Sequence, residues 1–140
     1  MKNFKIYLSG GMGNLSWSEQ TKWRNSVTKY FKKYENLKYK IEVFDPTKYY
    51  NFQVKKHDTE LEVMKFDIRN VKDSDLVLVY FNEPKSIGTA QELAVAWDNR
   101  IPIIGVKTKD IDVHPWLKED CDKMFEDLYE ACDYIVDYYL

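Results

Sequence analysis

The segment SIGTAQELAVAW, residues 86–97, places an acidic side chain, Glu92, about one turn inside an expected Ala-rich helix. The run 89–92, Thr-Ala-Gln-Glu, matches a capping box, in which the Glu side chain turns back to the first amide of its helix. The alternative is catalytic. Glu92 shares a helix side with Val95 and Ala96, so burial removes water from the carboxylate, while the helix N-terminus favours its ionised form. An ionised, poorly hydrated carboxylate at a ligand crevice suits covalent catalysis.

Asp67 raises the same question on a second expected helix, residues 59–73. It falls on or beside the apolar stripe formed by Leu61, Met64, Ile68 and Val71. Exposed acids belong on the far side of such a helix. Asp67 is therefore either a solvated side chain at the margin of the stripe or an acid aimed into a ligand site. Asp73 and Asp75 are expected to end this helix and to start the strand that follows.

Apolar runs and helical patterns alternate along the chain, and together they position these acids. Strands are expected at 4–11, 39–46, 75–81 and 101–106. Helices are expected at 16–34, 59–73, 89–99 and in the tail 121–140, with a loop containing DVHPW before the tail. Strands separated by helix-length segments predict an α/β fold with a parallel sheet covered on both faces.

Ligands of such sheets bind outside the carboxyl ends of the strands. This rule selects SGGMGN (9–14), DPTKYYN (45–51) and NEPKSIGTAQE (82–92), which are expected to line one crevice. SGGMGN lacks the lysine and spacing of a Walker loop and the fingerprint of a dinucleotide site. SGGMGN is therefore only a weak indication of a phosphate-binding loop.

Composition limits the classes of function. The 140 residues fit one domain, 1–140, and a content of 44% hydrophobic and 31% charged residues predicts a globular chain. A net charge of −2 gives no general case for nucleic-acid binding. No apolar run approaches the roughly 20 residues that cross a bilayer, and the start MKNFKIYLSGG is too short for a signal-peptide core. We expect a cytoplasmic protein that binds no membrane.

The sequence gives no indication of a metal site or a disulfide. His57 and His114 have no Cys or His neighbour at ligand spacing. If Cys121 and Cys132 share the tail helix, their separation of about three turns is too long for a bridge, and both are expected to be core thiols.

Three segments carry a resemblance to a known family: KIYLSGG, MKFDIRNVKDSDLVLVYF and SIGTAQELAVAWDNRIPIIGV, spread over residues 5–106. In this order they resemble the nucleoside 2-deoxyribosyltransferase family, which has relatives that are N-glycosidases of nucleoside 5′-monophosphates. The resemblance implies a Rossmann- or flavodoxin-like three-layer sandwich with a mainly parallel central sheet. It implies cleavage of the N-glycosidic bond of 2′-deoxynucleosides, with Glu92 as nucleophile, Tyr7 orienting it and Asp67 handling the nucleobase.

The implied chemistry is a double displacement like that of retaining glycosidases. Glu92 attacks C1′ to form a covalent deoxyribosyl-enzyme, and a second base then displaces Glu92. Asp67, with a pKa raised by apolar surroundings, protonates the departing base. The reaction needs no metal or cofactor. The partners are small molecules, a deoxynucleoside or deoxynucleotide and a nucleobase, and the family further implies a homodimer or higher homo-oligomer.

Two alternatives remain open. One is a hydrolase of (deoxy)nucleoside 5′-monophosphates, in which water resolves the intermediate. Its phosphate pocket could be supplied by Ser9, Gly10, Gly11, Ser86 and Gly88. Asn82 and Glu83 take the place where the family often carries a further carboxylate, and they complete the expected substrate-binding residues. The other alternative is a nucleotide-binding or sensing module without catalytic activity.

Overall fold

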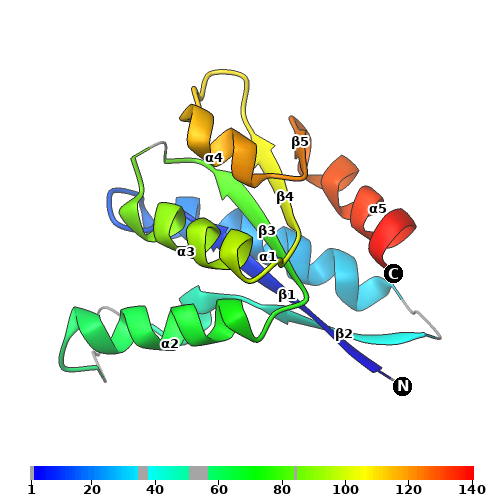
Figure 1. Ribbon diagram of the computed structural model, residues 1–140, viewed down its shortest axis with the longest axis horizontal. Coiled ribbons are helices and arrows are strands. Elements are labelled where there is room, and N and C mark those ends of the chain that lie inside the picture. The colour runs from blue at the N-terminus through cyan, green and yellow to red at the C-terminus, as the bar shows by residue number, and fades with distance from the viewer. Residues whose placement is uncertain (1, 35–37, 51–56, 84) are drawn as a thin grey trace.

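The computed structural model describes residues 2–34, 38–50, 57–83 and 85–140 (Figure 1). The strands are β1 (Lys2–Gly10), β2 (Tyr39–Phe44), β3 (Leu76–Phe81), β4 (Ile103–Lys107) and β5 (Lys123–Phe125). The helices are α1 (Trp17–Lys33), α2 (Glu60–Lys72), α3 (Ile87–Asp98), α4 (Pro115–Asp120) and α5 (Leu128–Tyr139), with a short 3₁₀ turn, η1 (Pro46–Lys48). Within these described ranges, no helix has the length and apolar character that crossing a membrane requires. Residues 51–56 and 84, which belong to the expected crevice loops or adjoin them, lie outside the described residues.

All five strands are parallel and lie in the order β2-β1-β3-β4-β5. This is the flavodoxin-like order, in which the direction of winding reverses between β1 and β3. Ile6 pairs with Leu76 at one end of the β1–β3 ladder and Gly10 pairs with Tyr80 at the other. The two strands therefore end side by side, at the point where ligands of this fold class bind.

Helices cover both faces of the sheet, so the expected three-layer α/β sandwich is confirmed, with every strand parallel (Figure 1). One core lies under α1 and α5 and contains Trp23, Val27, Phe31, Ala131, Cys132 and Ile135. The other lies under α2, α3 and α4 and contains Val71, Leu93, Ala96 and Val113. The buried β1 and β3 form the floor that both cores share. This floor fixes the strand ends from which the crevice is built.

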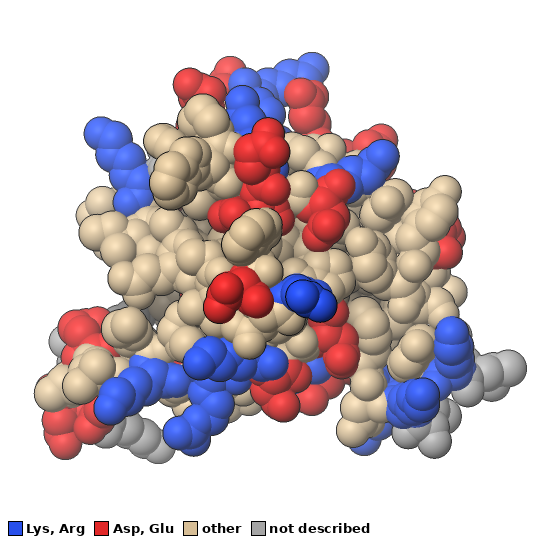
Figure 2. Space-filling model, viewed as in Figure 1, with Lys and Arg blue, Asp and Glu red and all other residues tan. Residues whose placement is uncertain are grey.

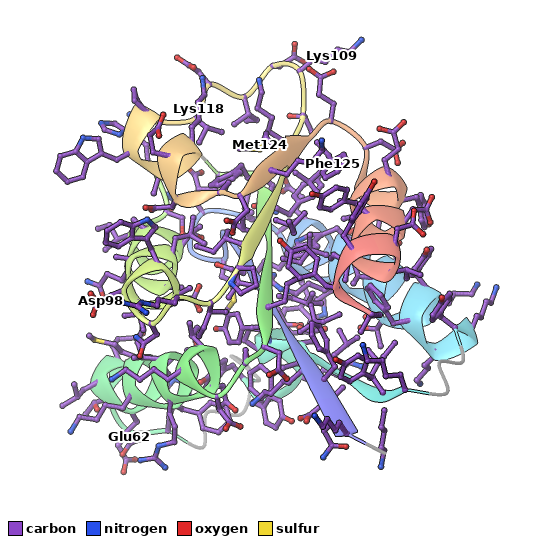
Figure 3. All side chains as sticks on the ribbon, turned by 45° about the vertical axis from the view of Figure 1, so that its right-hand side comes forward. Glu62, Asp98, Lys109, Lys118, Met124 and Phe125 are labelled. Atoms are coloured by element: carbon purple, nitrogen blue, oxygen red, sulfur yellow. The ribbon has the colours of Figure 1, made fainter. Side chains whose placement is uncertain are left out.

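The expectation of a single helix over 121–140 is wrong in its first part. Lys123–Phe125 pairs with β4 as an edge strand, and α5 begins only after Asp127, whose side chain accepts from the amides of Tyr129 (2.8 Å) and Glu130 (3.0 Å). Met124 and Phe125 point to opposite faces of β5 (Figure 3). Each of them packs against a different core, which a helix would not allow. The expected loop before the tail also contains a short helix, α4, whose N-cap is His114.

The two cysteines occupy different elements, contrary to the expectation of one shared helix. Cys121 caps the end of α4, whereas Cys132 lies in α5, and neither forms a disulfide. Burial raises the pKa of both thiols to about 12. Both are therefore protonated at neutral pH and are packing groups rather than nucleophiles.

Candidate active site

A cleft with a volume of about 700 Å³ opens at the carboxyl ends of the strands. Each of the three loops that the sequence placed there contributes lining residues, so that expectation is confirmed; α2 and α3 supply the remaining walls. The expected site residues that line the cleft are Tyr7, Gly10, Asp67, Glu83, Ser86, Gly88 and Glu92. Ser9, Gly11 and Asn82 are not among the lining residues.

The position of Glu92 follows from where α3 begins. The helix starts at Ile87, and its N-cap is Ser86, whose hydroxyl oxygen accepts from the amide of Thr89 at 3.2 Å. The capping-box reading of 89–92 is therefore wrong, because Thr89 already lies inside the helix. Glu92 instead belongs to the buried stripe of α3, together with Thr89, Leu93 and Ala96, and is 8% exposed.

Two hydroxyl groups of β1 hold the Glu92 carboxylate. Tyr7 donates its phenol to Oε2, and Ser9 donates its hydroxyl to Oε1 at 2.9 Å. The two donors are two residues apart on a strand, so both project from the same face of the sheet. The Tyr7 ring is fixed in turn by stacking on Phe44, with ring centroids 5.5 Å apart. One carboxylate thus has both oxygens fixed at the wall of the cleft.

Burial raises the pKa of Glu92 to about 7, and the negative charge of Asp67 contributes to this rise. The hydrogen bonds from Tyr7 and Ser9 and the cation of Arg24 oppose the rise by favouring the ionised form. Burial and the neighbouring Glu92 also raise the pKa of Tyr7 well above its usual value. Tyr7 therefore stays protonated at neutral pH and remains a hydrogen-bond donor to Glu92.

Asp67 faces the same cleft from α2. It accepts a hydrogen bond of 2.8 Å from the phenol of Tyr50, a buried side chain. Burial raises the pKa of Asp67 to about 6, against the lowering effect of that bond and of Arg24. An acid with this pKa can both donate and accept a proton near neutral pH.

Gly11 and Asn82 join the loops rather than line the cleft. The amide of Gly11 donates to Oδ1 of Asn82 at 3.1 Å, and the side-chain amide of Asn82 donates to the Glu19 carbonyl at 3.4 Å. A Cβ on Gly11 would lie 2.4 Å from the Cβ of Glu83, so only glycine allows this approach. These contacts fix the loop after β1 against the loop after β3.

The apolar stripe of α2 lies only partly in the core. Val71 is fully buried, but Leu61 and Met64 are 54% and 48% exposed and line the cleft with Ile68. The first half of α2 thus turns its apolar side to the cleft instead of the sheet. Basic side chains gather over α2 on the face seen in Figure 2, where its exposed residues include Lys65, Arg69 and Lys72.

Sequence reasoning missed two residues that act on this site, Arg24 and Tyr50. The pattern Gln20, Arg24, Val27 and Phe31 places Arg24 on the buried stripe of α1, so the argument that singled out Asp67 would have found it. Tyr50 lies in a loop, and no periodic signal marks it. Arg24 reaches the cleft from the face of the sheet opposite to α2 and α3.

The site contains two of the groups that a bond-breaking reaction requires, a nucleophile and an acid. Glu92 is a fixed carboxylate that can act as a nucleophile, and Asp67 is an acid that can protonate a leaving group. Leu61, Met64, Ile68 and Ile87 offer apolar lining for a flat or hydrophobic portion of a ligand. Among the described residues, no group of three or more His, Cys, Asp or Glu side chains is arranged to hold a metal ion.

Comparison with known proteins agrees with this architecture. The sequence model of a family described as nucleoside 2-deoxyribosyltransferase like matches residues 3–109. No curated protein matches the sequence.

Three solved structures share the fold. A 2-deoxyribosyltransferase from Bacillus psychrosaccharolyticus superposes with a TM-score of 0.68 at 20% identity, covering 90% of this chain and 88% of its own. A conserved protein from Enterococcus faecalis V583 gives 0.74 at 13% identity, covering 96% and 98%. A 2-deoxyribosyltransferase from Leishmania mexicana gives 0.63 at 14% identity, covering 98% and 99%. At these identities the likeness establishes the fold.

Proposed function

Because the chain belongs to the nucleoside 2-deoxyribosyltransferase-like family, we propose that it cleaves the N-glycosidic bond of 2′-deoxynucleosides and transfers the sugar to another nucleobase. The observation that carries the proposal is the buried Glu92 carboxylate, held by Tyr7 and Ser9 at the wall of the cleft. Both of its oxygens are fixed, so the carboxylate is preorganised for attack on one carbon of a bound ligand.

In the first half-reaction, Glu92 attacks C1′ of the bound deoxynucleoside while the bond between C1′ and the base nitrogen breaks. Asp67 gives its proton to the departing base, which leaves as a neutral molecule. The products are the free base, an Asp67 carboxylate and a deoxyribosyl ester on Glu92 with inverted configuration at C1′. The transition state resembles an oxocarbenium ion, as in retaining glycosidases.

In the second half-reaction, a nitrogen of the incoming base attacks C1′ and displaces the Glu92 carboxylate. The incoming base loses a proton to Asp67, which restores the starting state of both acids. Two inversions return the original configuration at C1′. Asp67 thus alternates between proton donor and proton acceptor, a role that its pKa of about 6 allows.

The proposal is tested by incubating the protein with a purine or pyrimidine deoxynucleoside and a different free base, followed by chromatographic separation of the products. A transferase forms the new deoxynucleoside in proportion to the base released. Release of base together with free deoxyribose, and no new nucleoside, would contradict transfer. Absence of any cleavage across a panel of deoxynucleosides and deoxynucleotides would contradict the enzymatic proposal as a whole.

A second candidate is hydrolysis of nucleoside 5′-monophosphates. The observation that favours it is that Lys85, Ser86 and Gly88 line the cleft at the start of α3. A helix N-terminus and a lysine together attract phosphate. The same chromatographic experiment with a deoxynucleoside 5′-monophosphate would then yield free base and deoxyribose 5-phosphate, without an acceptor base.

Replacing Tyr7 by Phe is expected to lower kcat/KM by about 10- to 100-fold, since it removes one hydrogen bond to a charged group but no reacting atom. Because that bond lowers the pKa of Glu92, its loss should raise that pKa further above the pKa of Asp67 and move the alkaline limb of the pH profile to higher pH. The measurement is kcat/KM for base exchange across a range of pH. The control is Tyr80→Phe, because Tyr80 lies on β3 and outside the cleft lining. Unchanged activity of Tyr7→Phe would show that Tyr7 has no role in the reaction.

The kcat/KM of the wild-type protein is expected to follow a narrow bell-shaped pH profile. The reaction needs ionised Glu92 and protonated Asp67, whose pKa values are raised to about 7 and about 6. Activity should peak midway between the two values and fall about tenfold per pH unit on either side, with the two apparent constants belonging to the pair. A profile that stays flat from mildly acidic to mildly alkaline pH would contradict this pairing.

A further inference from the structure

Arg24 is a buried cation at the cleft that the proposed mechanism does not use. Its side chain is 1% exposed, although it contributes to the cleft lining. Nη1 donates to the Gln20 carbonyl at 2.7 Å, Nη2 donates to the Gly10 carbonyl at 3.2 Å, and the guanidinium lies over the Trp23 ring, 4.6 Å from its centroid. Gly10 follows Ser9, which holds Glu92. Arg24 therefore fixes the end of the strand that carries both donors to Glu92.

The counter-ion of Arg24 neutralises it incompletely. Asp45 is equally buried, but its Oδ1 lies 3.8 Å from Nε of Arg24, beyond hydrogen-bond distance. That oxygen accepts instead from the amide and the hydroxyl of Thr47, at 2.9 and 2.6 Å. Nε of Arg24 and Oδ2 of Asp45 have no hydrogen-bond partner among the described residues. The positive charge of the guanidinium is therefore only partly neutralised by Asp45, and it also acts on the ionisable groups of the cleft.

The charges around Glu92 come from three sides. Tyr7 faces it from β1, Asp67 with its partner Tyr50 approaches from α2, and Arg24 approaches from α1. The cation of Arg24 lowers the pKa of both Glu92 and Asp67, while burial lowers the pKa of Arg24 itself. The other cation among the described lining residues is Lys85, which is exposed to water; Glu60 and Glu83 are the remaining acids.

We propose that Arg24 is a positioning residue that sets the ionisation of Glu92 and Asp67 together, from the opposite side of the sheet. This inference rests on the proposed function, in which one of these acids must be ionised and the other protonated. A cation favours the charged form of every carboxyl group near it. Arg24 thus keeps both acids titrating near neutral pH, where burial and their mutual repulsion alone would push them higher.

Removing the charge of Arg24 should shift the pH profile, whereas the loss of a purely structural residue should not. In Arg24→Met, the pKa of Glu92 and the pKa of Asp67 both rise, so both limbs of the kcat/KM profile should move to higher pH by roughly one unit. In Arg24→Lys the charge is kept and the limbs should stay near their wild-type positions, even if kcat/KM falls because the two-pronged anchor is lost.

The variant Arg24→Met leaves Asp45 buried without its counter-ion, which destabilises the fold. The paired variant Arg24→Met/Asp45→Asn removes both charges, and the amide oxygen of the introduced asparagine can still accept from Thr47. Because Asp45 is not among the main groups that shift the pKa of Glu92, whereas Arg24 is, the paired variant should also show an upward shift. Lys29→Met serves as the matched control: Lys29 lies on α1 like Arg24, but its cation is solvated and outside the cleft lining, so both limbs should stay in place.

The experiment combines pH profiles of kcat/KM with an NMR titration of ¹³C-labelled Glu and Asp carboxyl groups, assigned with Glu92→Gln and Asp67→Asn. The titration needs no turnover, so it separates this inference from the proposed function. Upward shifts of both carboxyl groups in the paired variant and their return in Arg24→Lys support the inference, whether or not the protein exchanges bases. Titration curves that coincide in the wild-type and paired variants would overturn it, as would a uniform loss of kcat/KM at every pH.

Discussion

Glu92→Gln is expected to lower kcat for base exchange by roughly 10⁴-fold or more, the loss typical of removing a nucleophile. Glutamine has nearly the shape of glutamate, but its amide cannot displace the base from C1′. The fold should survive, because one of the two hydroxyls of Tyr7 and Ser9 can still donate to the amide oxygen, the other can accept from the amide nitrogen, and the site no longer buries a charge. Turnover and thermal unfolding, measured on the same preparation, check both expectations.

The reacting residue can be identified by intact mass after mixing with a slow 2′-fluoro deoxynucleoside. The wild-type protein should gain the mass of one sugar on Glu92, whereas Glu92→Gln should gain none. Asp98→Asn is the matched control, since Asp98 lies on α3 but outside the cleft lining (Figure 3). Near-normal exchange by Glu92→Gln would defeat the double-displacement mechanism.

Asp67→Asn is expected to lower kcat/KM by roughly 10²- to 10⁴-fold, the usual contribution of general acid–base catalysis. The alkaline limb of the pH profile should disappear, because no acid remains to be deprotonated. The acidic limb that remains should report the pKa of Glu92 alone, which falls below its wild-type value because the charge of Asp67 no longer raises it. The profile therefore changes shape as well as height.

The leaving base gives the sharpest test of this role. A deoxynucleoside with an electron-poor base needs little protonation to depart, so Asp67→Asn should lose far less rate with it than with an ordinary base. Glu62→Gln, on the outer side of α2, should behave like the wild-type protein with both (Figure 3). Equal losses with both substrates would show that Asp67 does not protonate the base.

The positions of Glu92 and Asp67 could be predicted because an acid within an apolar stripe has few structural explanations. The start of α3 could not, since Ser86 and Thr89 are both good N-cap residues and lie one turn apart. In the structure α3 begins at the earlier cap, and the Glu92 side chain accepts from Tyr7 and Ser9 instead of turning back to the first amide of its helix.

Other features could not be predicted from the sequence, each for a different physical reason. An apolar stripe does not indicate whether it covers a sheet or a cleft, so the sequence could not show that Leu61 and Met64 line the cleft. A three-residue strand such as β5 is too short to show the two-residue periodicity of a strand. The helical pattern of the following segment, α5, therefore makes the predicted helix include it. Arg24 was not predicted as a site residue because a basic residue on a helix is ordinarily solvated.

Within a single chain, all the described lining residues of the cleft come from the segment 7–92. Everything after Glu92, including β4, β5 and α5, supports the sheet without reaching the ligand space. Laboratory evolution toward new leaving bases should therefore concentrate its diversity on the rim positions Leu61, Met64 and Ile87. Within one chain, substitutions after Glu92 are expected to act on this cleft through the packing of the sheet.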